Sequence, residues 1–154
     1  MYATSVAVEV NPAGVTHVLG HEQVWRGLVM KAENAVPFVP GMESCIVLER
    51  HADGLLREVV VRGNRFKERI TFTAPVQVHF ERVDTAEHAG WITNVISEWD
   101  RGLLLTFTYA VNFPGMTPAS DEERRQGEAM KSAYVSAIEA TLRAVRKLAV
   151  EGKL

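Results

Sequence analysis

The segment from Glu43 to Phe113 constrains the fold more than any other part of this sequence. It consists of apolar and alternating stretches, separated by short turn sequences such as Asp53-Gly54 and Gly63-Asn64. Strands at regular spacing with tight turns between them are typical of an antiparallel meander. The predicted strands are Glu43–Ala52, Leu55–Arg62, Arg65–Thr73, Val76–Asp84, Trp91–Trp99 and Leu103–Phe113.

A long helix is predicted after the last of these strands. Ser120 is followed by three acidic residues, a pattern that caps a helix N-terminus and places negative charge at its positive end. Gly152 ends the helix, which therefore spans about Ser120 to Glu151. Its apolar stripe comprises Met130, Tyr134, Ala137, Ile138, Leu142, Val145 and Leu148.

Three shorter elements precede the meander. Tyr2–Val10 alternates like a strand, and His21–Asn34 has the apolar spacing of a helix, with Gly20 as its N-cap. The segment Ala35–Gly41 contains two prolines, so we expect a short turn or a one-turn helix there. With that turn counted as helical, the N-terminal part holds two short helices.

These elements predict one α+β domain over residues 1–154. A seven-stranded antiparallel sheet has one face to cover, and the long terminal helix has the apolar stripe that covers it. Because a strongly curved sheet cannot contact a straight helix along its whole length, we expect an apolar cavity between them. The predicted architecture is therefore a curved sheet wrapped around the C-terminal helix.

The composition of the chain argues against several classes of function and location. The net charge of −2 argues against a nucleic-acid binder, which would carry a basic excess. The one cysteine, Cys45, excludes an intramolecular disulfide and suits a reducing, cytoplasmic location. The N-terminus has no signal-peptide pattern, and polar residues interrupt the apolar run Gly102–Met116, so we expect no membrane span.

Turn positions predict which side chains face the interior, because a slip of one residue reverses every side chain of a strand. Two-residue loops at Asp53-Gly54 and Gly63-Asn64 bring the apolar residues of three strands onto one face. That interior face contains Ile46, Leu48, Val59, Val61, Phe66, Glu68, Ile70 and Phe72, and the outer face contains Cys45, Glu58, Lys67 and Arg69.

The remaining strands follow the apolar pattern. A three-residue loop around Pro75 places Arg82 opposite Glu68, with Arg57 diagonal to Glu68 and Arg50 opposite Arg57. In the last two strands the odd-numbered residues are bulky, so we expect them inside. The inward residues from these strands are then Val76, Val78, Phe80, Trp91, Thr93, Val95, Ser97, Trp99, Leu103, Leu105, Phe107, Tyr109 and Val111.

Glu68, Arg82 and Arg57 are the charged residues expected on this apolar face. A buried carboxylate needs partners or an altered pKa, so the three form either a polar anchor for a ligand or an internal salt bridge. Tyr109 and Tyr134 are expected to face each other from sheet and helix, as ligand hydrogen-bond donors or as core residues. The predicted cavity lining is Glu68, Arg82, Arg57, Tyr109, Tyr134, Phe66, Ile70, Phe80, Phe107, Trp91, Met130 and Ile138.

The sequence lacks the motifs of metal sites, nucleotide-binding sites and serine hydrolases. No HExxH or CxxC pattern occurs, so we expect no metal site. No GxGxxG, Walker or GxSxG sequence occurs, which argues against nucleotide cofactors and serine hydrolysis. Cys45 has no histidine near it in sequence and is not expected to act as a nucleophile. We therefore expect no cofactor.

Four strings, Gln23–Leu28, Lys31–Asn34, Phe38–Pro40 and Leu105–Tyr109, together with the element order, carry a family resemblance. They resemble the START, birch-pollen-allergen and polyketide-cyclase superfamily (SRPBCC), and its AtaL-like subfamily in particular, over nearly the whole chain. The resemblance implies the helix-grip fold with a ligand cavity, in which members bind lipids, sterols, quinones and polyketides. The strings are structural, so they transfer no catalytic residue.

Three functions stay open at this point. The chain is a non-catalytic carrier or sensor of a small hydrophobic molecule, of lipid, quinone or polyketide type. Alternatively, it is a cyclase or dehydratase in which Glu68 or Tyr109 acts as acid or base and Arg82 as oxyanion partner. In the third interpretation it is a protein-interaction module with a filled core. A homodimer also stays open.

Overall fold

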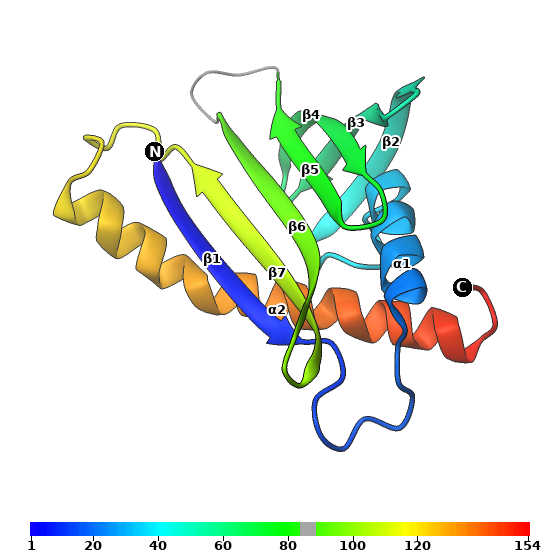
Figure 1. The fold of residues 1–154 in the computed structure, drawn as a ribbon. Coiled ribbons are helices and arrows are strands. Elements are labelled where there is room, and N and C mark those ends of the chain that lie inside the picture. Colours follow the sequence, from blue (N-terminus) through cyan, green and yellow to red (C-terminus); the bar gives the residue numbers. More distant parts are fainter. Residues whose placement is uncertain (84–88) are drawn as a thin grey trace.

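The computed structural model describes residues 1–83 and 89–154, and these contain seven strands and two helices (Figure 1). The predicted end of one strand at Asp84 lies outside the described residues. All predicted strands and both main helices are present close to their expected bounds. In chain order they are β1 (Tyr2–Glu9), α1 (His21–Glu33), β2 (Met42–His51), β3 (Gly54–Val61), β4 (Asn64–Thr73), β5 (Gln77–Arg82), β6 (Gly90–Trp99), β7 (Gly102–Val111) and α2 (Asp121–Val150).

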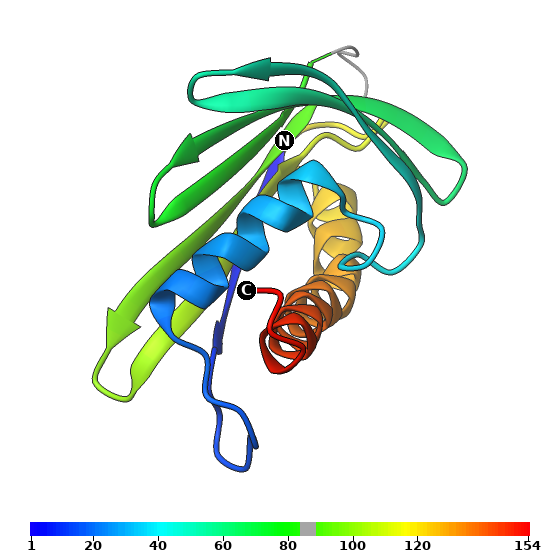
Figure 2. The same cartoon turned by 90° about the vertical axis from the view of Figure 1, so that its right-hand side faces the viewer.

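The strands form one antiparallel sheet in the order β1-β7-β6-β5-β4-β3-β2. The sheet curves around both helices, which lie on its concave side (Figure 2). This arrangement confirms the predicted α+β class and the wrapping of the sheet around the terminal helix. No helix within the described residues has both the length and the apolar character needed to cross a membrane.

The prediction of a second N-terminal helix is wrong. The chain after α1 forms hydrogen-bonded turns instead, in which the backbone N–H groups of Phe38 and Val39 donate to the carbonyl of Ala35, at 3.0 and 2.9 Å. Pro37 and Pro40 lack the N–H groups that a continuing helix would use, so the segment stops after one turn.

The core lies between the concave face and the two helices. α1 and α2 approach closely because α1 presents Gly27 at the crossing: a Cβ atom there would lie 2.4 Å from Cγ2 of Val145. The largest fully buried side chains come from both helices and from the sheet, and include Leu28, Leu55, Ile70, Leu105, Phe107, Ile138 and Val145.

The predicted cap of α2 is confirmed. The Ser120 hydroxyl accepts a hydrogen bond from the Glu123 N–H at 3.1 Å. The Glu123 carboxylate accepts from the Ala119 N–H at 2.7 Å and pairs with the N-terminal amino group at 3.1 Å. The backbone N–H of Ala119, followed by the amino group, lowers the pKa of Glu123. The start of α2 is thereby tied to the start of β1.

On β3, β4 and β5 the predicted interior face is confirmed. Phe66, Glu68 and Ile70 are buried, whereas Lys67 and Arg69 are exposed. The turn between β3 and β4 differs in detail, since Val61 pairs with Asn64 and the loop residues are 62 and 63. This shifts the pairing by two residues, which keeps every side chain on its expected face and brings Arg57 directly opposite Glu68.

On β2 the predicted faces are wrong. Ile46 and Leu48 are 55% and 45% exposed, and Cys45 and Val47 pair with Val59 and Arg57 of the interior face. A register irregularity between Val47 and Glu49 adds one residue to β2, and one added residue reverses the strand. Arg50, expected opposite Arg57, pairs with Leu55 and forms a 2.6 Å ion pair with Glu33.

On β6 the predicted faces are also wrong. Trp99 pairs with Gly102 across a two-residue loop, so even residues of β6 share the face of the odd residues of β7. Ile96 and Asn94 are consequently buried opposite Leu105 and Phe107. The residues that move to the outer face are Trp91, Thr93, Val95, Ser97 and Trp99. On β7, the expected burial of Leu105, Phe107 and Tyr109 is confirmed, and Val76 is 38% exposed in the loop before β5.

Candidate functional site

The concave face contains a polar cluster inside the apolar core. Lys31 from α1, Arg57 from β3, Glu68 from β4 and Asn94 from β6 are all buried there. Burial of polar and charged groups is unfavourable unless they find partners. The partners of each member therefore indicate whether the group serves the fold or is free to bind something else.

Arg57 and Glu68 serve the fold. The Arg57 Nη2 and Nε atoms lie 2.7 and 2.9 Å from Oε2 of Glu68, in a forked ion pair. Nη1 donates to the carbonyls of Lys31 and Ala32, at 2.9 and 2.8 Å. These carbonyls lie in the last turn of α1, where a helix leaves its carbonyls without helical partners. The ion pair therefore caps α1 and fixes it to the sheet, as the salt-bridge interpretation expects.

Arg82 lies directly opposite Glu68, as predicted from the loop at Pro75. The ion pair of Glu68, however, is formed with Arg57. The guanidinium carbon of Arg82 lies 4.0 Å from the centre of the Phe66 ring. Its charge also acts on Tyr134, where it opposes the rise in pKa that burial causes. Arg82 is thus the cation of this face that lies near aromatic rings of both sheet and helix.

Lys31 and Asn94 form a second polar unit, which sequence reasoning missed. Nζ of Lys31 donates to Oδ1 of Asn94 at 2.8 Å, and it lies 4.2 and 5.2 Å from the ring centres of Phe107 and Phe80. Loss of hydration, then the nearby Arg57, lowers the pKa of Lys31 to about 7, although Glu68 opposes this. The amine is therefore poised to exist both protonated and neutral near pH 7.

Signals for both residues were present in the sequence. Lys31 lies seven residues after Val24, on the apolar stripe of α1, where a charged residue is unexpected. Asn94 would have been found if the parity of β6 had been assigned from the loop at Asp100-Arg101 rather than from the size of its side chains.

Tyr109 and Tyr134 face each other, as predicted. Their rings stack with centres 3.6 Å apart and planes 8° apart, so sheet and helix are in direct contact there. The Tyr134 hydroxyl lies 3.7 Å from Sδ of Met130. Burial raises the pKa of both phenols, so both keep their protons near neutrality.

The other predicted lining residues divide into two groups. Ile70, Phe107 and Ile138 are at most 1% exposed, whereas Phe66, Glu68, Tyr109 and Tyr134 retain 6–8% exposure. All of these residues are therefore buried, and the second group keeps only slight contact with solvent. Phe80 is 4% exposed and Met130 is half-buried, but Trp91 lies on the outer face, where its ring centre is 5.8 Å from that of His79.

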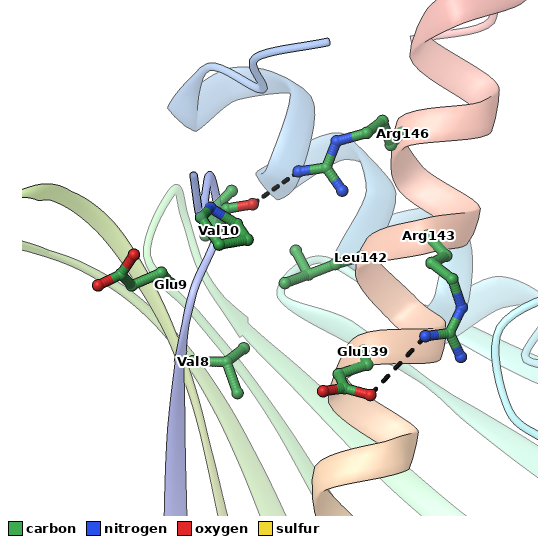
Figure 3. A pocket seen from close by; sticks show the side chains of 8 residues that line it. Val8, Glu9, Val10, Glu139, Leu142, Arg143 and Arg146 are labelled. Carbon is green, nitrogen blue, oxygen red and sulfur yellow. Dashed lines mark hydrogen bonds and ion pairs between the residues drawn. The ribbon is translucent and has the colours of Figure 1, made fainter. Parts of the chain in front are cut away.

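A separate groove of about 540 Å³ lies between β1 and the second half of α2 (Figure 3). Val8 and Leu142 point into it, and Glu139, Arg143 and Arg146 border it. Arg146 donates to the carbonyl oxygens of Val10 and His17, at 2.6 and 2.9 Å, and so holds the chain between β1 and α1. None of the predicted site residues lines this groove.

The described residues contain no group of three histidine, cysteine, aspartate or glutamate side chains placed to hold a metal ion. Cys45 faces the interior rather than the solvent, with Sγ 3.7 Å from Nη1 of Arg57 and 3.6 Å from the carbonyl oxygen of Glu33. Cys45 therefore lies beside the Arg57–Glu68 ion pair that fixes α1 to the sheet.

The model of one protein family matches almost the entire sequence. This is AtaL, described as acetylaranotin biosynthesis cluster protein L, and the match covers residues 4–152. No curated protein matches the chain significantly.

Solved structures share the fold. The di-domain ARO/CYC BexL from the BE-7585A biosynthetic pathway is 11% identical, with a TM-score of 0.67 over 95% of this chain and 49% of that chain. This chain thus spans about half the length of BexL. The Zhui aromatase/cyclase from Streptomyces sp. R1128 is 19% identical, with a TM-score of 0.65 over 96% and 94% of the two chains. A START superfamily protein from Mycobacterium smegmatis is 16% identical, with a TM-score of 0.61 over 92% and 96%.

Proposed function

Since the chain belongs to the family of acetylaranotin biosynthesis cluster protein L, we propose that it binds a small hydrophobic molecule, of lipid, quinone or polyketide type, between its concave face and α2. The observation that carries the proposal is the composition of that face. It is apolar and aromatic, it contains a few convergent polar groups, and its residues Phe66, Glu68, Tyr109 and Tyr134 keep 6–8% exposure. Pockets for small apolar molecules have this composition. The names of BexL, a di-domain ARO/CYC, and Zhui, an aromatase/cyclase, support an aromatic ligand.

We propose a carrier or sensor rather than a catalyst. The carboxylate of Glu68, a predicted acid or base, is already engaged by Arg57. The other predicted group, Tyr109, has a pKa raised by burial and keeps its proton. A cyclase or dehydratase function is the second candidate, and the observation that favours it is Lys31, whose pKa of about 7 suits proton transfer at neutral pH.

The binding site is tested with Nile red, a neutral dye whose fluorescence rises in apolar surroundings. We expect Tyr134→Leu to weaken dye binding about three- to tenfold, because an aromatic contact is replaced by a smaller aliphatic one. Arg143→Ala, at the separate groove, is the matched control and should leave binding unchanged. If Arg143→Ala weakens dye binding and Tyr134→Leu does not, the dye binds in the groove and the proposal is contradicted. Native mass spectrometry of the purified protein would identify a ligand that co-purifies.

A further inference from the structure

We propose that Lys31 and Asn94 form the polar end of this binding site and bind an acidic oxygen of the ligand, that of a phenol or an enol. This inference rests on the proposed function and makes it more specific. It assigns a role to the two buried polar residues that the Arg57–Glu68 ion pair does not use.

Asn94 has a buried N–H donor without an acceptor among the described residues. Its side chain is fully buried, its Oδ1 accepts from Lys31, and no described residue accepts a hydrogen bond from its Nδ2. Turning the amide around would place Nδ2 against the Lys31 amine, so the orientation is determined by Lys31. A buried N–H group without an acceptor is unfavourable, and buried polar groups in proteins nearly always have a partner. A ligand oxygen would be that partner.

Lys31 has N–H donors beyond the one that Asn94 accepts. A protonated amine has three N–H donors, and Asn94 is its hydrogen-bond acceptor in the described residues. The rings of Phe107 and Phe80 face the amine, but no described carboxylate forms an ion pair with it. Lys31 and Arg57 together carry more positive charge than Glu68 balances. The unit Lys31–Asn94 thus has surplus donors and, when the amine is protonated, surplus positive charge.

The complement of this unit is an oxygen that accepts hydrogen bonds and carries, or takes up, negative charge. Phenols and enols fit better than carboxylates, because with a weakly acidic partner the proton moves between the ligand oxygen and Nζ. The buried pair is then neutral overall on either side of that transfer, whether it is amine and phenol or ammonium and phenolate. The pKa of Lys31, about 7, lies below the pKa of a phenol, about 10, so the neutral amine and phenol is the favoured form.

The surrounding side chains select a flat, aromatic ligand. Phe80 and Phe107 lie against the amine, and Tyr109 follows Phe107 on the same face of β7, with ring centres 6.1 Å apart. Lys31 is 6% exposed and Asn94 is fully buried, so this polar unit lies inside the core. A ring that replaces the Tyr109–Tyr134 contact would bring its oxygen toward Lys31.

The test compares naphthol with naphthalene and methoxynaphthalene by isothermal titration calorimetry. We expect the wild-type protein to bind naphthol about tenfold or more tightly than either analogue, which is the range for a hydrogen bond to a charged group. Lys31→Met and Asn94→Leu should abolish this preference while naphthalene still binds. Lys147→Met, which removes an exposed lysine, is the control and should keep the preference.

The two levels of the inference fail differently. A naphthol preference that survives in either folded variant, Lys31→Met or Asn94→Leu, or that is missing from the wild type while all three compounds bind, would overturn the assignment of Lys31 and Asn94 alone. Failure of all three compounds to bind the folded wild type would overturn the proposed function as well. Lys31→Met removes the amine, and Asn94→Leu removes the amide. Each variant therefore tests the assignment by itself, provided that it folds.

Discussion

Replacing Lys31 by methionine probes the energetic state of the buried amine directly. Burial and Arg57 lower the pKa of Lys31 from 10.5 to about 7. Each pKa unit corresponds to ~1.4 kcal/mol of folding free energy, so the whole difference is worth about 4–5 kcal/mol. Methionine keeps the length and apolar character of the side chain but removes the ionisable group.

The direction of the effect follows from proton binding. Below about pH 7 both native and unfolded chains hold the proton, so the native state bears the full cost of burying a charge. Between about pH 7 and 10.5 the unfolded chain keeps the proton and the native chain releases it, so the free energy of unfolding rises with pH. The wild type should therefore gain roughly 2 kcal/mol relative to Lys31→Met from pH 7 to pH 9.

Urea unfolding followed by tryptophan fluorescence, at several values of pH, measures this difference. Comparing the two proteins at each pH cancels the other titrating groups, including Tyr109 and Tyr134, whose pKa values are both raised. The exposed Lys147→Met variant should run parallel to the wild type. If Lys31→Met also runs parallel to the wild type over this range, the amine is not held neutral by burial and the reasoning is refuted.

Three further changes test the framework of the fold, each by chemical denaturation. Arg57→Ala should destabilise the protein by about 3–5 kcal/mol, because it leaves Glu68 buried without its partner. Arg57→Met combined with Glu68→Met should recover much of this loss. If the effects of the two substitutions are additive in the double variant, the pairing is contradicted. Gly127→Ala should not add the ~1 kcal/mol of stability that alanine usually gives a helix, because its Cβ would lie 2.2 Å from the Tyr2 ring. The gain in stability should appear when Tyr2 is also replaced by alanine. Ser120→Ala should cost about 1 kcal/mol through loss of the α2 cap, and an unchanged midpoint would mean that water replaces the hydroxyl.

The sequence predicted the elements well because turns and apolar periods are local signals. The face of β4 was predicted correctly even though its turn was misplaced, since a shift of two residues preserves the alternation. The faces of β2 and β6 were not, because the irregularity near Leu48 and the two-residue loop before Gly102 each change the alternation by one. Both changes depend on how neighbouring strands pair, and that pairing cannot be predicted from the residues of one strand alone.

The same limitation explains the missed polar unit. The sequence pointed to Glu68, Arg82 and Arg57 because all three interrupt apolar alternation. The pairing of Arg57 with Glu68, and the approach of Lys31 to Asn94 from a different layer of the fold, depend on how α1 docks. No spacing within one element predicts that docking.

The position of β1 in the sheet has a consequence for the order in which the protein folds. β1 pairs with β7, and the hydroxyls of Ser5 and Thr108 meet at 2.9 Å although they are 103 residues apart. β2 to β5 are joined to one another by short loops, so their pairing requires closure of only small loops. β1 can therefore pair only after β7 is available, and the edge of β7 stays unpaired until β1 docks.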